Sequence, residues 1–202
     1  MKKLINIAVL VSGGGTNLQA LIDFSADGNL TSGRLVKVIS SNGDAYALTR
    51  AKESYIDSAV VERKGKTQQE FESGLIKELD ACEAEVIVLA GFMCILSKDF
   101  TDRYKDRIIN VHPSLIPSFC GQGYYGLKVH EKALEYGVKV TGATVHLVNE
   151  IPDGGKIIMQ KAVSVKDDDT PKKLQKRVME QAEWKILPMA VEKVCKSICK
   201  GE

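Results

Sequence analysis

Short apolar runs alternate along the chain with longer stretches whose apolar residues have helical spacing. The run Glu85–Ala90 is apolar after its first residue, which is typical of a strand buried on both faces of a parallel sheet. Because such units repeat, the pattern predicts an α/β fold with a doubly wound, mostly parallel sheet and helices on both faces. In the first half of the chain the expected strands are 5–11, 35–40, 58–61 and 85–90, and the expected helices are 17–24, 45–53 and 68–81.

The second half of the chain continues the alternation. A strand that begins at Ile108 is cut short by Pro113, because proline and its predecessor leave regular structure. Thr170 and Pro171 provide an N-cap and a first-turn proline for one long final helix. No repeat or linker interrupts the sequence, so we expect a single domain over 1–202. The other expected elements are a helix over 129–136 and strands over 139–148 and 156–165.

Composition limits the function. The net charge of +2 argues against a nucleic-acid partner. The five cysteines are odd in number and lack paired C-x-x-C spacing with histidines, which argues against disulfides and zinc and favours a reducing cytoplasm. The apolar N-terminal run ends in glycines without a small-residue cleavage site, so we do not expect a signal peptide. No apolar run has the length of a membrane span.

Asn110 and His112 are the first candidates for chemistry. One residue separates them, so period-two geometry places both side chains on one face of the strand. An amide donor beside an imidazole suits a carbonyl oxygen on which negative charge develops. The alternative is a histidine whose hydrogen bonds are merely satisfied at a strand end.

The glycine-rich turn Ser12–Asn17 lies between the first expected strand and helix. Its backbone amides and the positive end of the helix would face an anion. The turn lacks the Gly-Lys-Ser/Thr of a P-loop and the third glycine of a dinucleotide fingerprint. A single phosphate monoester is therefore the expected ligand, and a turn with packing duties only is the alternative.

Asp153 precedes two glycines, which are free to adopt positive φ and to let a ligand approach the backbone. Its carboxylate, if near His112, would favour the imidazolium and assist proton transfer. Most Asp-Gly pairs are simple turns, so this signal is weak by itself. His146 could lie beside Asp153 or be a core histidine, and His130 is expected at the surface.

The loop 91–96 is unusually apolar. It could form the floor of a pocket for a flat aromatic ligand, or it could be core that continues into the next helix. Cys195 and Cys199 lie four residues apart on the final helix, and we expect them to pack rather than to bind metal.

Five motifs in order along nearly the whole chain together resemble the folate-dependent formyltransferases. They are Ser-Gly-Gly-Gly-Thr-Asn-Leu-Gln-Ala from 12, Leu-Ala-Gly-Phe-Met-Cys-Ile-Leu from 89, Asn-Val-His-Pro-Ser-Leu-Ile-Pro from 110, Gly-Ala-Thr-Val-His from 142 and Asp-Gly-Gly-Lys-Ile-Ile-Met-Gln from 153. The resemblance implies a Rossmann-like formyltransferase fold and formyl transfer from 10-formyltetrahydrofolate to the amine of glycinamide ribonucleotide in purine biosynthesis. It implies small-molecule substrates and no metal, nucleic acid or membrane, in a cytoplasmic monomer or homodimer.

The same resemblance assigns roles to residues. It implies a catalytic trio of Asn110, His112 and Asp153, with Asp153 keeping His112 cationic near neutral pH and His146 in support. It places phosphate binding in a half of about 1–105, and catalysis and folate binding in a half of about 106–202. The implied ligand contacts are Gly15, Thr16 and Asn17 for the phosphate, Glu183 for the ribose, and Gln68, Met93, Cys94, Ile95, Leu96 and Asn110 for the folate.

Two of these positions depart from the family pattern, because Cys94 and Gln68 stand where its members usually have arginine. The loop 120–126 is also longer than usual. Two alternatives stay open: a hydrolase of 10-formyltetrahydrofolate, and a phosphometabolite-binding module without catalysis. The near-neutral charge disfavours a relative that acts on tRNA.

Overall fold

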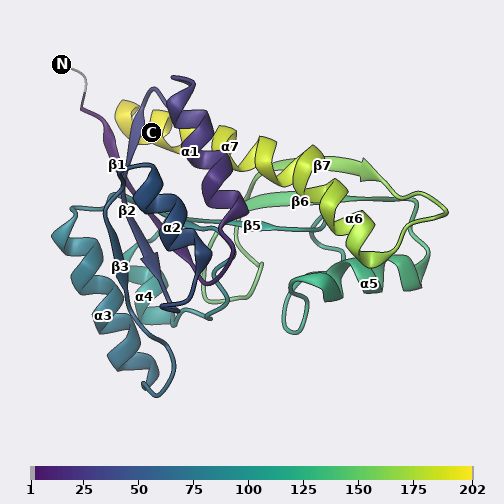
Figure 1. The fold of residues 1–202 in the computed structure, drawn as a ribbon, viewed down its shortest axis with the longest axis horizontal. Helices are drawn as coiled ribbons and strands as arrows, with labels where there is room; N and C mark the ends of the chain where they lie inside the picture. The colour runs from purple at the N-terminus through teal and green to yellow at the C-terminus, as the bar shows by residue number, and fades with distance from the viewer. Residues whose placement is uncertain (1–2, 202) are drawn as a thin grey trace.

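The computed structural model describes residues 3–201, which form one seven-stranded sheet with helices on both faces (Figure 1). The strand order is β3-β2-β1-β4-β5-β6-β7. Strands β1 to β5 pair in parallel, and β6 pairs antiparallel with both β5 and β7. The predicted fold class is confirmed. The strands are β1 (Ile5–Val11), β2 (Gly33–Ser40), β3 (Ser58–Val60), β4 (Val86–Leu89), β5 (Ile108–His112), β6 (Val140–Leu147) and β7 (Ile157–Ser164).

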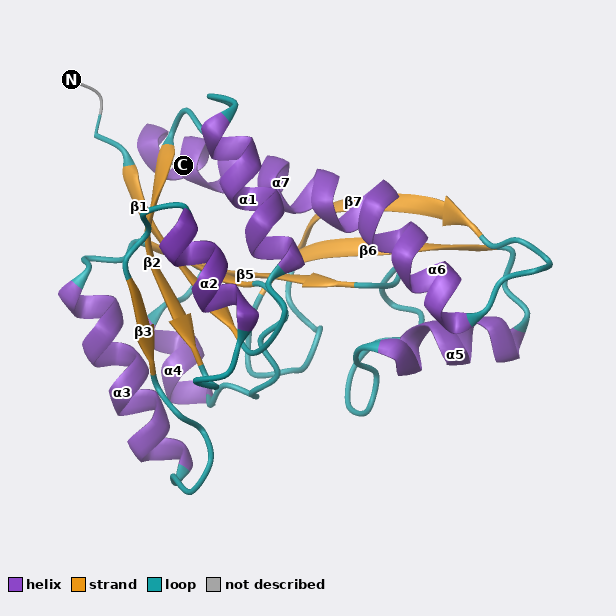
Figure 2. Cartoon of the chain, in the orientation of Figure 1, coloured by secondary structure: helices purple, strands orange, loops and turns teal. Residues whose placement is uncertain are grey.

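The helices divide between the two faces of the sheet (Figure 2). Side chains alternate along β1, so Ile7 and Val9 pack under α1, α2 and α7, whereas Ala8 and Leu10 pack under α3 and α4. All four are fully buried, as expected for a strand covered on both faces. The helices are α1 (Thr16–Ala26), α2 (Tyr46–Glu53), α3 (Gln68–Ala81), α4 (Lys98–Arg103), α5 (Leu127–Tyr136), α6 (Pro171–Val178) and α7 (Trp184–Lys200).

The predicted final helix is interrupted. A five-residue π-helical turn, η1 (Met179–Glu183), joins α6 to α7. Such turns occur mostly inside α-helices and often at functional sites. The sequence pattern does not predict α4, and the remaining predicted bounds differ from the structure by at most two residues.

Strand pairing places Asn110 of β5 between β4 and β6. Leu89, the last residue of β4, pairs with Asn110 on one side. His146 of β6 pairs with it on the other. The loops after β1, β2, β3 and β4 all leave from the same edge, because these strands are parallel. Among residues 3–201, no helix is long and apolar enough to cross a membrane.

Candidate active site

Asn110 and His146 form a cross-strand pair. Asn110 Nδ2 lies 3.2 Å from His146 Nε2, and His146 Nδ1 lies 2.7 Å from the carbonyl oxygen of Leu147. Since a carbonyl only accepts, His146 Nδ1 carries a proton. Nε2 accepts from Asn110 when it is unprotonated and faces Asp153 Oδ1 as a donor when it is protonated. The histidine thereby orients the Asn110 carboxamide, with its second N–H free to donate elsewhere.

The carboxylate of Asp153 lies between the two histidines. Its Oδ2 is 3.4 Å from His112 Nδ1 and accepts from the Gly121 backbone N–H at 2.9 Å, and its Oδ1 is 3.6 Å from His146 Nε2. The structure therefore brings together all three residues of the expected catalytic trio and the supporting histidine. Burial raises the pKa of Asp153, but His146, the charge of His112 and the Gly121 N–H together hold that pKa below its ordinary value.

The turn that carries Asp153 differs from the expectation. Asp153 itself has the positive φ, at 57°, and neither Gly154 nor Gly155 does. The glycines are required by space instead, because a Cβ on Gly155 would lie 1.7 Å from the Leu147 carbonyl oxygen. Aspartate tolerates the left-handed region better than most residues. The turn thus presses its backbone against β6 and directs the carboxylate toward the histidines.

His112 is buried and already hydrogen-bonded. Its Nε2 donates to the carbonyl oxygen of Phe119 at 2.8 Å, so Nε2 carries a proton in both the neutral and the cationic ring. Burial lowers the pKa of His112, and the Asp153 carboxylate and the Phe119 carbonyl raise it by less, so the pKa lies below its ordinary value. The expectation that Asp153 keeps His112 cationic near neutral pH is therefore wrong, because burial outweighs the carboxylate.

A small cavity of about 130 Å³ opens beside the trio. Cys94, Ile95 and Leu96 line it together with Asn110 and Asp153. Two expected folate contacts lie elsewhere. Met93 is 58% exposed and outside the lining, and the Gln68 amide donates to the Ile95 carbonyl oxygen at 2.9 Å. Gln68 thus supports the loop that forms the cavity instead of lining it.

The expected phosphate and ribose contacts meet at the start of α1. Gly15 is the N-cap of α1 with φ 71°, and a Cβ there would lie 2.7 Å from the Cβ of Ala47. Thr16 begins the helix, and Asn17 Nδ2 donates to Glu183 Oε2 at 2.8 Å. The structure brings these four residues together from opposite ends of the chain, and the π turn delivers Glu183.

Glu183 is buried, and burial raises its pKa to about 6 despite the hydrogen bond from Asn17. The folded state therefore holds this proton more tightly than the ordinary value of 4.5 implies. The resulting stabilisation is present below about pH 4.5 and is lost as pH rises through about 6.

Glu183→Gln should remove this pH dependence. Relative to the unsubstituted protein, the variant should gain about 2 kcal/mol of unfolding free energy between acid and neutral pH, at about 1.4 kcal/mol per pKa unit. Denaturant unfolding at both pH values measures the change. Glu180→Gln, an exposed position in the same π turn, is the matched control and should give a constant difference. The same constant difference for Glu183→Gln would contradict the assignment.

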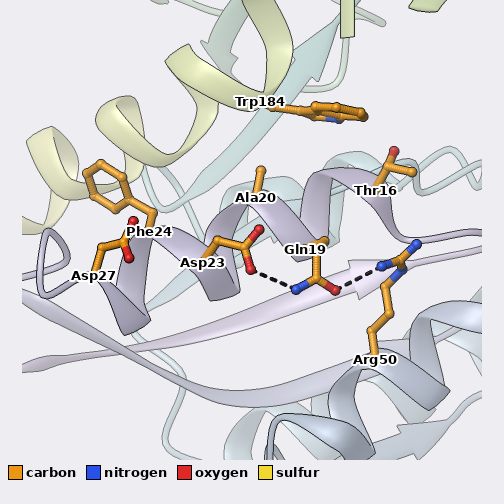
Figure 3. A pocket seen from close by; sticks show the side chains of 8 residues that line it. All are labelled: Thr16, Gln19, Ala20, Asp23, Phe24, Asp27, Arg50 and Trp184. Atoms are coloured by element: carbon orange, nitrogen blue, oxygen red, sulfur yellow. Dashed lines mark hydrogen bonds between the residues drawn. The ribbon is translucent and has the colours of Figure 1, made fainter. Parts of the chain in front are cut away.

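A second cavity, of about 380 Å³, adjoins the start of α1 (Figure 3). Thr16 and Trp184 line it with Arg50, whose Nε donates to the Gly14 carbonyl oxygen at 2.9 Å and whose Nη1 donates to Gln19. The sequence reasoning missed Arg50 and Trp184. Arg50 is 36 residues from the loop it contacts, so only the parallel pairing of β1 and β2 could have indicated their proximity. Within the described chain, buried Trp184 Nε1 and Asn17 Oδ1 have no hydrogen-bond partner, as expected beside a ligand site.

His130 is fully buried, so its predicted surface position is wrong. It shares the inner face of α5 with Val129 and Ala133. Burial lowers its pKa to about 4, so the ring is neutral near pH 7. Cys195 packs in the core, where burial raises its pKa to about 12, as expected for an inert thiol. Within residues 3–201, no cluster of histidine, cysteine and acidic side chains suits a metal ion.

Comparison with known proteins identifies the family. A family model described as formyl transferase matches residues 5–191. Phosphoribosylglycinamide formyltransferase of Haemophilus influenzae is 40% identical over 95% of this chain and 86% of its own length. Human trifunctional purine biosynthetic protein adenosine-3 is 43% identical over 96% of this chain, which spans 18% of that protein. The crystal structure of glycinamide ribonucleotide transformylase 1 from Symbiobacterium toebii is 37% identical, with a TM-score of 0.89 over 96% of this chain and 89% of that one. The chain therefore belongs to the formyl transferase family.

Proposed function

We propose that the protein transfers the formyl group of 10-formyltetrahydrofolate to the amine of glycinamide ribonucleotide. The observation that carries this proposal is the Asn110, His112 and Asp153 cluster, which lies beside a cavity with both apolar and polar lining residues that would hold the folate ring. The phosphate of the ribonucleotide would bind at the α1 N-terminus, where backbone amides and the helix dipole favour an anion. Arg50 adds a positive charge there, and Glu183 would meet the ribose.

The cluster suits direct attack of the amine on the formyl carbon. A tetrahedral intermediate with an oxyanion forms, and the second N–H of Asn110 and the Nε2–H of His112 would stabilise it. The substrate oxygen would take the place of the Phe119 carbonyl oxygen as the acceptor for Nε2. Holding the two substrates in register supplies much of the acceleration.

Protons move as the charge develops. The attacking nitrogen becomes cationic and must lose a proton, and the departing folate nitrogen must gain one. Asp153 Oδ2 lies 3.4 Å from His112 Nδ1, so the carboxylate can pass a proton from the amine to this nitrogen, directly or through water. The His112 cation then forms where the oxyanion needs it, although burial lowers the pKa of His112 in the free protein. On collapse of the intermediate the proton returns through Asp153 to the departing folate nitrogen, which leaves as the neutral amine.

Turnover of 10-formyltetrahydrofolate with and without glycinamide ribonucleotide tests the function. We expect release of tetrahydrofolate only with the ribonucleotide, in equal amount to the formylated product. Release without it would indicate a hydrolase, in which water is the acceptor. Binding of both ligands without release would indicate a non-catalytic binding module. The ribonucleoside without its phosphate is the control substrate, and its KM should be higher because it lacks the anion that the α1 N-terminus would bind.

A further inference from the structure

Arg63 is a half-buried cation close in sequence to β3, the outermost strand of the sheet. It follows β3, and its Nη2 donates to Gln68 Oε1 at 3.2 Å while its guanidinium lies 5.5 Å from the centre of the Phe71 ring. Within residues 3–201, no carboxylate pairs with it. Arg177, also shielded from solvent, is by contrast paired with Asp169. An arginine held in place without a counter-ion is suited to bind an anion from outside the chain.

The acidic side chains around Arg63 are engaged elsewhere. Glu62 accepts from the Gly43 N–H, and Glu70 accepts from the Thr67 N–H as part of the helix cap. Glu72 accepts from Ser97 and from Gln68. The exposed cations Lys64 and Lys66 lie on the same turn as Arg63. Among the described residues, Arg63 is therefore left without a carboxylate partner, although carboxylates and cations alternate around it.

Arg63 is linked to the cavity beside the trio by two routes. One runs through Gln68, which bonds both Arg63 and the carbonyl oxygen of Ile95. The other runs through Phe71, whose ring stacks on Phe92 with centroids 6.2 Å apart. Ile95 and Phe92 both line the cavity. Burial raises the pKa of Cys94, and the Arg63 charge is among the groups that oppose this rise, so Arg63 also lies near a third lining residue.

The cavity is too small for a whole folate. Its volume of about 130 Å³ compares with roughly 300–1,000 Å³ for pockets that enclose a drug-sized ligand. One end of the folate would fit, and the glutamate tail, which carries carboxylates, must extend over the surface. Among the lining residues, Glu150 and Asp153 would repel the tail, whereas Phe92 and Ile95 belong to the loop that is linked to Arg63.

We infer that Arg63 binds the glutamate-tail carboxylates of 10-formyltetrahydrofolate and so determines selectivity for folates that carry glutamate. The inference rests on the proposed function, because it needs the folate ring in the cavity. It also bears on the departures at Cys94 and Gln68, because Arg63 donates to Gln68 and its positive charge acts on Cys94. One guanidinium can therefore supply positive charge near both positions.

Arg63→Gln should weaken binding of tetrahydropteroylglutamate about ten- to a hundredfold, the range for loss of a charge-assisted hydrogen bond. Binding of tetrahydropteroate, which lacks glutamate, should not change. In turnover, the KM for 10-formyltetrahydrofolate should rise by the same factor with kcat within about twofold, because the tail is remote from the reacting atoms. Arg63→Lys should fall between the two, since it keeps the charge but not the forked donors.

Arg103→Gln is the matched control. Arg103 is the last residue of α4, pairs with Asp80 near the C-terminal end of α3 and also lies over an aromatic ring, that of Tyr104. It should leave both affinities unchanged. Cys94→Arg in the Arg63→Gln protein should restore affinity for the glutamate-bearing ligand, which a merely structural role for Arg63 would not allow.

Equilibrium binding separates the two proposals, because it requires no turnover. Equal losses for the glutamate-bearing and glutamate-free ligands in Arg63→Gln, or no loss for either, would overturn the role of Arg63 while leaving the function intact. Failure of the unsubstituted protein to bind either ligand would overturn the proposed function and the Arg63 inference with it.

Discussion

His112→Ala should lower kcat for formyl transfer about a hundred- to a thousandfold, the usual effect of losing one oxyanion donor. The Nε2–H of His112 is the donor at issue, and its direction is fixed by the strand end and by the Phe119 carbonyl oxygen 2.8 Å away. Asn110 and the substrate-binding groups would stay, so the variant should keep measurable activity. Single-turnover kinetics with both substrates saturating measures the chemical step.

The loss should appear in kcat rather than in binding, because the imidazole acts on charge that exists only in the transition state. Folate affinity should therefore stay close to that of the unsubstituted protein, and thermal unfolding measures separately the stability lost with the buried imidazole and its hydrogen bond to Phe119. Asn110→Ala should give a loss of similar size, and the double variant should lose less than the sum of the two, since both donors face one oxyanion. Retention of more than about a third of the rate in His112→Ala would remove His112 from the mechanism.

Regular structure in this chain is strongly encoded by its periodicity. The helix Gln68–Ala81 and the strand Ile5–Val11 were predicted with the bounds that the structure has, because their apolar positions match one helix face and one fully buried strand. The π turn Met179–Glu183 was not predicted, since its residues continue a helical pattern and nothing in their types marks the wider turn. The burial of His130 was missed for a related reason: a single polar residue does not show which helix face it occupies.

The sequence predicted the main side chains of the site but not the backbone groups that contact them. Motif spacing indicated Asn110 and His112, and the structure places Asp153 against them. The partners that tune these groups are backbone atoms, the Phe119 carbonyl and the Gly121 N–H, which every residue type carries and no sequence pattern distinguishes. The lowered pKa of His112 was also not predicted. Burial lowers it and depends on the whole fold, whereas the opposing charge of Asp153 can be inferred from one motif.

Asp153→Asn should lower kcat about a hundred- to ten-thousandfold, as expected for loss of a positioned proton carrier. The asparagine keeps an oxygen that can accept from the Gly121 N–H, so the loop contact survives while the negative charge between His112 and His146 disappears. Asp167→Asn is the matched control, because that carboxylate is 95% exposed and pairs only with Lys139 among the described residues. It should leave kcat unchanged.

The pH profile of Asp153→Asn distinguishes proton transfer from simple misfolding. Asp153 raises the pKa of His112 against the larger lowering by burial, so its removal lowers that pKa further. At any given pH a smaller fraction of His112 is then cationic, and the residual activity should shift toward acid pH. Measurement of kcat/KM across the stability range of the variant tests this shift. A profile that superimposes on that of the unsubstituted protein after scaling would mean that Asp153 does not act through the His112 proton, and that the transferred proton takes another route.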